Sequence, residues 1–468
     1  MAGRAVRILS VASECAPLVK TGGLADVAGA LPGALAAEGV EMVTLLPGYP
    51  AVLSALAGAE AVHEERDLMG GPARVLRGEA AGLKLLVLDA PHLYDRDGSI
   101  YLGPDGHDWP DNPERFAALC WVAAALAGDY DAVHCHDWQA GLVPYYLRDK
   151  PTPTILTIHN IAFHGLAPPE RIGALRLVPS DFNPEGFEFW GKVSALKAGL
   201  VWADKLTTVS PTYAEELMRP EFGMGMEGMM RARAGDLSGI LNGIDEGVWS
   251  PATDPHIAPY KTPRGKARNK AALREELGLP DSGGPLCVVI SRLTGQKGMD
   301  LLLESLPALL SRGGQLALLG SGEPAIQEAF QDLSAQPGVA VRIGYDEALS
   351  HRLIAGGDAI LVPSRFEPCG LTQLYGLRYR TIPVVALTGG LADTVINASP
   401  AALARRVATG LQFYPVTATA LGNALSRLCD LWEAPEIWAD LQKNAMSHPV
   451  GWENSAKAYA SLYFSLRH

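Results

Sequence analysis

Short apolar runs rich in branched residues recur along the chain, with room for a helix between neighbours. They occupy residues 6–12, 41–46, 83–88, 131–136 and 154–159 in the first half, and 286–290, 315–319, 339–343, 358–362 and 382–386 in the second. Such runs are typical of strands buried on both faces of a parallel sheet. Helical spacing of apolar residues over 24–35, and an apolar stretch over 114–127, predict helices between strands. The pattern predicts an α/β fold in which ligands bind beyond the carboxyl ends of the strands.

The length of the chain and the position of its prolines indicate how it is divided into domains. A chain of 468 residues is too long for one comfortable core, so we expect two domains or more. A loop-like stretch with several prolines follows residues 242–245 and is interpreted as a linker. We therefore expect one domain over residues 1–245 and a second over residues 246–449. Residues 450–468 carry aromatic and apolar side chains at helical spacing, which predicts a helix packed on the fold.

A glycine pair, Gly22-Gly23, stands between the first predicted strand and the first predicted helix. Adjacent glycines allow a sharp turn and a close approach of backbone N–H groups to a ligand, and the Lys20 ammonium beside a helix N-terminus favours an anion. A plain tight turn with a solvated lysine is the alternative. The string TGGLAD recurs at residues 388–393, again after an apolar run. The repeat favours two related strand-loop-helix units, although similar turn chemistry would also produce it.

Polar side chains follow two neighbouring predicted strands of the first half. Asp137 comes after one strand, and His159-Asn160 end the next. These groups suit the hydroxyls of a sugar, while a purely structural histidine is the alternative. The nearby His134-x-His136-Asp137 contains residue types that bind metals, but no second cluster of ligands accompanies it. We expect hydrogen-bonded structural histidines and no metal.

The second half carries cations and a carboxylate in strand-to-helix loops. Arg292 and Lys297 lie in one such loop and are suited to holding a pyrophosphate from two sides, although exposed surface charges would show the same pattern. Glu367 precedes Gly370, which opens a predicted helix whose first amides are free to meet phosphate. A carboxylate beside an anion site suits sugar hydroxyls, so this combination fits a nucleotide-sugar. A simple N-terminal helix charge is the alternative for Glu367.

The composition of the chain argues against some classes of binding partner. With 39 Lys+Arg against 51 Asp+Glu the net charge is −12, which argues against a nucleic-acid surface or an anionic membrane surface. No apolar stretch reaches the roughly 20 residues of a membrane span. The six cysteines form no CxxC pair, which indicates free thiols in a reducing cytoplasm. The GxGxxG pattern at residues 223–228 follows a predicted helix and not a strand, so we interpret it as a loop and not as a dinucleotide site.

Motifs distributed in order along almost the whole chain resemble those of the bacterial glycogen synthases and plant starch synthases. They lie at residues 20–27, 136–139, 158–160, 242–245, 291–298 and 363–375. The resemblance implies the GT-B fold, with two Rossmann-like domains facing across a deep cleft and the C-terminal helix packing back on the N-terminal domain. It also implies a cytoplasmic retaining glucosyltransferase. Such an enzyme takes glucose from ADP-glucose and adds it to the 4-hydroxyl at the non-reducing end of an α-1,4-glucan, and we expect no cofactor.

Matching motifs carry expected roles onto particular residues. The cations would neutralise the departing diphosphate, Glu367 would bind the glucose hydroxyls, Tyr345 would stack on adenine, and Tyr94 would lie at the acceptor end. The expected catalytic residues are Asp137, His159, Arg292, Lys297 and Glu367. The expected donor- and substrate-binding residues are Lys20, Gly23, Asp26, Tyr94, Asn160, Asn242, Tyr345, Cys369, Gly370, Leu371 and Thr372.

Some positions depart from the usual pattern of the family. Gly295 replaces a Trp, Leu387 replaces an Arg, and Arg380 replaces a small residue, often Gly, at an expected helix-to-strand turn. Tyr375 stands where many related retaining transferases have a second Glu, as in the glycogen synthase branch. Two alternatives stay open. The first is the same transfer from UDP-glucose, because no residue derivable from spacing alone separates adenine from uracil. The second, which the three departures suggest, is a catalytically weak protein that binds glucan or nucleotide.

Overall fold

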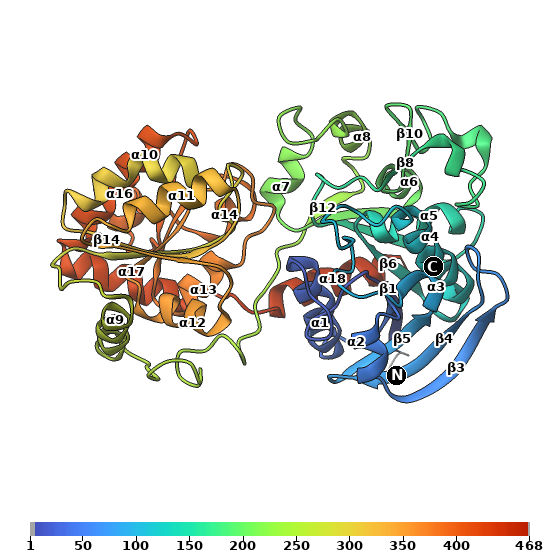
Figure 1. The fold of residues 1–468 in the computed structure, drawn as a ribbon, viewed down its shortest axis with the longest axis horizontal. Helices are drawn as coiled ribbons and strands as arrows, with labels where there is room; N and C mark the ends of the chain where they lie inside the picture. The colour runs from blue at the N-terminus through green and yellow to red at the C-terminus, as the bar shows by residue number, and fades with distance from the viewer. Residues whose placement is uncertain (1–4, 467–468) are drawn as a thin grey trace. The chain divides into compact units, whose positions relative to one another are not determined.

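The computed structural model describes residues 5–466, in which strands and helices alternate and gather into two units (Figure 1). The chain passes from the first unit to the second between Asn242 and Gly243, and it returns to the first between Gly451 and Trp452. Within residues 5–466 no helix is long and apolar enough to cross a membrane. The six cysteine thiols are all buried and form no disulfide in this part of the chain.

The first unit is built on a nine-stranded sheet with the order β12-β11-β7-β6-β1-β2-β5-β4-β3. The pairs from β12 to β5 are parallel, whereas β3 and β4 run antiparallel at one edge. The strands are β1 (Val6–Val11), β2 (Val40–Pro47), β3 (Ala57–Glu65), β4 (Ala73–Ala80), β5 (Leu83–Asp89), β6 (Ala132–His136), β7 (Thr154–Ile158), β11 (Lys205–Thr208) and β12 (Leu237–Gly239). The predicted strands β1, β2, β5, β6 and β7 are thereby confirmed.

Helices cover the sheet of the first unit, and a small second sheet lies beside it. The helices are α1 (Gly23–Ala36), α2 (Pro50–Ala55), α3 (Pro91–Tyr94), α4 (Asn112–Leu126), α5 (Leu142–Leu147), α6 (Ala195–Trp202), α7 (Pro211–Glu216), α8 (Glu227–Ala232) and α18 (Glu453–Ser465), with short 3-10 turns η1 (Ala127–Asp129), η2 (Trp138–Ala140), η3 (Pro169–Arg171) and η4 (Pro179–Asp181). The small sheet has the order β8-β10-β9, with β8 (Leu166–Ala167), β9 (Glu188–Phe189) and β10 (Lys192–Ser194). The last helix, α18, buries Tyr459 and Tyr463 against Val27 and Leu31 of α1.

The second unit is a parallel sheet with the order β15-β14-β13-β16-β17-β18. Its strands are β13 (Leu286–Ile290), β14 (Gln315–Gly320), β15 (Val339–Ile343), β16 (Ala359–Val362), β17 (Ile382–Ala386) and β18 (Leu411–Phe413). Its helices are α9 (Pro263–Leu277), α10 (Met299–Leu310), α11 (Pro324–Leu333), α12 (Glu347–Gly356), α13 (Thr372–Arg378), α14 (Gly389–Thr394), α15 (Pro400–Ala404), α16 (Ala418–Trp432) and α17 (Pro435–Ser447). In Figure 1 the helices α10, α11 and α16 lie on one side of this sheet, and α9, α12, α13 and α17 on the other. The five strands predicted in this half are confirmed.

Arg380 lies in the expected helix-to-strand turn, between α13 and β17, and its backbone is left-handed with φ of 60°. Its guanidinium donates to the Lys261 carbonyl at 2.9 Å and contacts Met446 Sδ at 3.0 Å. Arg380→Gly therefore removes a backbone penalty of about 1 kcal/mol and loses a hydrogen bond of about the same value. We expect thermal unfolding to show a net change within about 1 kcal/mol. A rise of many degrees in the melting temperature would contradict the balance between these two terms.

Candidate active site

The carboxyl ends of β1, β6 and β7 meet at one edge of the first sheet, because these strands are parallel neighbours. The glycine loop follows β1, and α1 begins at Gly23. Lys20 Nζ lies 2.8 Å from Asp26 Oδ1 across this loop, and both side chains are partly exposed. A Cβ added to Gly23 would meet no atom within 4 Å. Packing within the first unit therefore does not require glycine at this position.

The buried carboxylate of Glu14 accepts hydrogen bonds from the glycine loop, a contact that the sequence did not predict. Glu14 accepts hydrogen bonds from the backbone N–H of Thr21 at 2.6 Å and from its hydroxyl at 2.7 Å. Burial raises the pKa of Glu14 above its ordinary value, although the Thr21 bonds oppose this. A lone Glu before a turn gives no pattern in the sequence, so only the fold shows the contact.

Asp137 joins the ends of β6 and β7. It is 8% exposed, and its Oδ1 accepts from the backbone N–H of His159 at 2.6 Å and of Asn160 at 3.3 Å. Its backbone has φ of 54° and ψ of −165°, a region that costs a non-glycine residue about 1–3 kcal/mol. Burial raises the pKa of Asp137 to about 7. The structure thus brings Asp137, His159 and Asn160 together with a strained backbone and a perturbed carboxyl group.

A chain of buried hydrogen bonds runs behind Asp137. His159 Nε2 lies 2.9 Å from His136 Nδ1, and His136 Nε2 lies 3.1 Å from Ser10 Oγ. Burial lowers the pKa of His136 to about 3 and the pKa of His159 well below its ordinary value, so both imidazoles are neutral at pH 7. The ring of His134 bonds to Tyr463 of α18 at 2.7 Å and to Thr157 at 2.6 Å. The interpretation of His134 and His136 as hydrogen-bonded structural groups is confirmed.

Asn242, the last residue of the first unit before the crossing, is 8% exposed. Its Oδ1 is buried and has no hydrogen-bond partner within residues 5–466. An unpaired buried acceptor costs about 1–3 kcal/mol, so a donor from a ligand or a water would stabilise this position.

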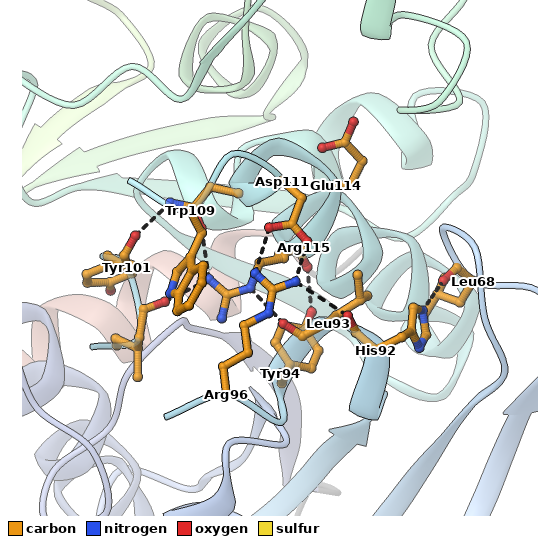
Figure 2. A network of polar contacts seen from close by, with 12 residues as sticks. Leu68, His92, Leu93, Tyr94, Arg96, Tyr101, Trp109, Asp111, Glu114 and Arg115 are labelled. Atoms are coloured by element: carbon orange, nitrogen blue, oxygen red, sulfur yellow. Dashed lines mark hydrogen bonds and ion pairs between the residues drawn. The ribbon is translucent and has the colours of Figure 1, made fainter. Parts of the chain in front are cut away.

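Tyr94 does not present a surface to an acceptor, contrary to the expected role. Its side chain is 1% exposed, and its hydroxyl donates to the Arg115 carbonyl at 2.5 Å (Figure 2). The buried Arg115 guanidinium donates in turn to the carbonyls of Leu93 and Ile100, each at 2.8 Å. Direct contact between Tyr94 and a glucan would require this packed segment to move, so we assign Tyr94 a structural role.

The network in Figure 2 fixes the loop between α3 and α4. Arg96 binds the Asp111 carboxylate with two of its guanidinium nitrogens, one of them at 2.7 Å, and its guanidinium lies 4.8 Å from the centre of the Trp109 ring. Tyr101, from the same loop, places its hydroxyl 2.6 Å from Ser13 Oγ, just beyond β1. The loop therefore borders the carboxyl end of β1, which the sequence did not indicate.

In the second unit, a cation and a hydroxyl group contact the carboxylate of Glu367. Lys297 Nζ lies 2.6 Å from Glu367 Oε2, and Ser364 Oγ donates to the same oxygen at 2.9 Å. Glu367 is 9% exposed. Arg292, in the loop after β13, is exposed, and its guanidinium has no hydrogen-bond or ion-pair partner within residues 5–466. The arrangement leaves one cation paired with a carboxylate and a second cation available to an anion.

Close backbone contacts hold the loops around Glu367 together. Gly298 has φ of 70°, and a Cβ added there would clash with the Pro363 carbonyl. Arg365 binds the Asp300 carboxylate at 2.7 Å through each of two nitrogens, and it also donates to the Gly295 carbonyl. A Cβ on Gly295 would meet only Arg365 Nη1, at 4.0 Å, so there is open space where the family has Trp.

The glycines of the second TGGLAD string, at residues 388–393, have a different structural role from those of the first. A Cβ added to Gly389 would clash with the Glu367 carbonyl, and one added to Gly390 with the Cys369 carbonyl. The N–H of Gly390 already donates to the Pro368 carbonyl at 3.0 Å. These glycines therefore let α14 pack on the segment that carries Glu367.

The remaining candidate residues of the second unit lie around α13 and after β15. Cys369 is buried, Gly370 has φ of 74°, and Leu371 and Thr372 begin α13. Tyr345 follows β15 with 85% of its surface exposed, and its hydroxyl contacts the Glu347 carboxylate. The expected stacking of this ring on a nucleotide base stays a prediction.

Tyr375, at the position of the second Glu of other transferases, packs inside the second unit. The Trp249 ring is stacked between Tyr375, with ring centres 3.8 Å apart, and His351, at 3.9 Å. No group of three or more His, Cys, Asp or Glu residues in the described chain is arranged to hold a metal ion.

Comparisons with known proteins extend over the whole chain. The family described as the starch synthase catalytic domain matches residues 7–232, and glycosyl transferases group 1 matches residues 284–430. The glycogen synthase of Paracoccus denitrificans is 65% identical, and that of a Jannaschia species is 62% identical, each over 98% of both chains. The catalytic domain of starch synthase IV from Arabidopsis thaliana, bound to ADP and acarbose, has a TM-score of 0.88 at 31% identity and covers 99% of both chains.

A more distant likeness concerns the fold alone. Sucrose-phosphate synthase from Thermosynechococcus elongatus has a TM-score of 0.59 at 19% identity, covering 98% of this chain and 99% of the other.

Proposed function

Because the chain belongs to the family of bacterial glycogen synthases and starch synthases, we propose that it transfers glucose from ADP-glucose to the non-reducing end of an α-1,4-glucan, with retention at the anomeric carbon. Its two α/β units, built on largely parallel sheets, have the GT-B fold. Identity of 65% to a glycogen synthase over 98% of both chains supports glucosyl transfer to a glucan. The starch synthase bound to ADP and acarbose supports a nucleotide-sugar donor and a glucan acceptor.

The observation that carries this proposal is the group formed by Lys297, Glu367 and Arg292 in the second unit. Cleavage of a nucleotide-sugar develops negative charge on the leaving diphosphate, and positioned cations stabilise that charge. Lys297 already lies 2.6 Å from Glu367. A bound donor would place its diphosphate against Lys297 and the unpaired Arg292, while Glu367 accepts hydrogen bonds from glucose hydroxyls. The amides from Cys369 to Thr372 would contribute further donors to the sugar and the phosphate.

In the first unit, Asp137 and His159 would orient the glucosyl group and the acceptor. The neutral imidazole of His159 has a hydrogen-bond partner on its Nε2, which leaves Nδ1 for a sugar hydroxyl. Asp137 places a buried carboxylate next to it, and Asn160 adds an amide. An oxocarbenium-like transition state, as in glycosyl transfer generally, is stabilised by such a negative charge.

Further residues would complete substrate binding. Lys20 and Gly23, with Asp26 beside them, would bind an anionic group at the open glycine loop. Tyr345 would stack its exposed ring on the nucleotide base, and the unpaired Oδ1 of Asn242 would accept a hydrogen bond from the substrate.

Incorporation of labelled glucose tests the proposal. The purified protein is incubated with ADP-glucose or UDP-glucose, on glycogen and on a maltooligosaccharide. We expect transfer from ADP-glucose to both acceptors at a rate well above that with UDP-glucose. Faster transfer from UDP-glucose would correct the donor, and binding of glycogen without transfer from either donor would overturn the enzymatic assignment.

We expect transfer to proceed without a divalent metal ion. Arg292, Lys297 and backbone amides supply the charge stabilisation for which other nucleotide-sugar enzymes use Mg²⁺. The measurement is the initial rate after dialysis against EDTA, with and without added Mg²⁺ or Mn²⁺. Complete loss of transfer in EDTA, restored by one of these ions, would contradict this expectation.

A further inference from the structure

An exposed tryptophan stands at the tip of the β9–β10 hairpin. The strands pair Phe189 with Lys192, so the turn consists of Trp190 and Gly191 alone. Both have positive φ, 50° and 76°, and the Trp190 side chain is 83% exposed. The hairpin belongs to the small sheet of the first unit (Figure 1).

Neither the turn nor the core explains a tryptophan at this position. Two-residue turns with positive φ at both positions strongly prefer Asn-Gly or Asp-Gly, and a bulky side chain there is strained. The turn is held by Gly191, whose N–H donates to Glu188 Oε1 at 2.6 Å, and not by the indole. A large apolar ring that is exposed on a strained backbone is typical of a binding surface.

The Trp190 indole nevertheless packs against other residues of the first unit. It lies edge-on to the Phe189 ring, with ring centres 6.2 Å apart, and Phe189 in turn lies 4.8 Å from His164. Gly225 approaches both aromatic rings, since an added Cβ would lie 3.0 Å from Phe189 and 3.4 Å from Trp190 Nε1. The aromatic surface formed by His164, Phe189 and Trp190 therefore rests on its own unit and leaves most of the indole exposed.

Hydrogen bonds and close packing connect this aromatic surface to the residue that follows Asp137. The His164 carbonyl accepts hydrogen bonds from Ser194 Oγ of β10 and from the Leu196 N–H of α6, each at 3.1 Å. The next residue, Gly165, packs so closely on the Trp138 ring that an added Cβ would clash with it. Trp138 directly follows Asp137 along the chain. The hairpin is thus built onto the segments that carry the proposed acceptor groups.

We propose that Trp190 stacks on glucose rings of the acceptor glucan away from its reacting end, so that the hairpin is a subsite for long chains. The proposal rests on the proposed function. A pyranose ring has an apolar C–H face and a rim of hydroxyls, which matches an amphipathic indole flanked by polar groups. Glu188 and Lys192, on either side of the turn, offer an acceptor and donors to those hydroxyls. A neutral glucan requires no cationic surface, unlike a phosphorylated ligand.

Trp190→Asn removes the indole and introduces the Asn-Gly turn that the backbone prefers, so the hairpin should remain folded. We expect the ratio of the KM for glycogen to the KM for maltotriose to rise about three- to tenfold. This change corresponds to the binding free energy of one aromatic contact. Glycogen should also retard the variant less than the wild type in native affinity electrophoresis, a readout that needs no donor. Trp190→Tyr should restore most of the affinity. Phe464→Ala, which removes another partly exposed aromatic of the first unit, is the matched control and should behave as wild type.

The outcomes separate this proposal from the proposed function. Unaltered retardation and an unaltered KM ratio in Trp190→Asn would overturn the subsite, and the hairpin would then serve another partner. An equal loss with glycogen and maltotriose would also overturn it, because Trp190 would then act at the reacting end. If the wild type transfers no glucose but binds glycogen through Trp190, the enzymatic proposal fails while the subsite stands.

Discussion

Lys297→Ala should lower kcat about 10²- to 10³-fold, the effect of removing one preorganised group that stabilises transition-state charge. Lys297 lies 2.6 Å from Glu367 and is only partly exposed, so it is positioned before the donor binds. The measurement is the initial rate of transfer from saturating ADP-glucose to glycogen. Lys443→Ala is the matched control, because Lys443 is an exposed lysine of the same unit on α17.

Stability must be measured together with the rate, because the substitution also leaves Glu367 without its cation. Breaking a pair that is largely buried destabilises a protein by leaving an uncompensated charge. The double variant Lys297→Ala, Glu367→Gln removes that charge and should recover the melting temperature without recovering kcat. An unchanged kcat in the folded single variant would reduce Lys297 to a structural ion pair, and recovery of kcat in the double variant would show that the loss arose from misfolding.

Sequence patterns predicted strands that form nearly continuous apolar runs and missed others, among them the exposed strand β3. The runs at β1 and β13 are nearly continuous apolar stretches, because helices cover both sides of these strands. By contrast β3 is exposed along most of its length, and its Ala, Gly and Glu residues show no strand periodicity. Its register with β4 also shifts, which weakens alternation further. Pairing with β4, and not its own residues, makes this segment a strand.

Local motifs predicted the strand-loop-helix units but not what each loop contacts. The two TGGLAD strings both connect a strand to a helix, yet Gly23 is open whereas Gly389 and Gly390 are packed against the Glu367 segment. The same residues allow both uses, because a missing Cβ permits either a ligand or a backbone to approach. The choice depends on segments distant in the sequence.

The burial of individual aromatic side chains could not be predicted from the sequence either. Tyr94 and Trp190 both lie at the ends of short elements, yet Tyr94 is 1% exposed and Trp190 is 83% exposed. Tyr94 is enclosed because Arg115 from α4 folds over it, and Trp190 is exposed because a two-residue turn points it away from the small sheet. The arrangement of non-local neighbours decides which aromatic packs and which is offered to a ligand.

Asp137→Asn should lower kcat about 10²- to 10³-fold at pH 8 while raising the melting temperature at that pH. The amide oxygen still accepts from the His159 and Asn160 N–H groups, so the substitution removes charge and little else. Burial raises the pKa of Asp137 to about 7. Because the native state then binds a proton more tightly than the unfolded chain, this group makes stability fall as pH rises from about 4 to about 7. The cost of the buried carboxylate is fully present above pH 7.

Two pH profiles separate a catalytic charge from a structural one. In the wild type, kcat/KM should increase through about pH 7 as Asp137 ionises, and thermal stability should decrease over the same interval. In Asp137→Asn both dependences should flatten, since the group that titrates is gone. If the variant has a flattened pH profile of stability but wild-type kcat/KM at every pH, Asp137 has a structural role at the strand ends. A different residue would then supply the negative charge next to the glucosyl group. A variant that loses activity but keeps the steep stability profile would show that a different buried acid, with Glu14 the nearest candidate, controls stability in this range.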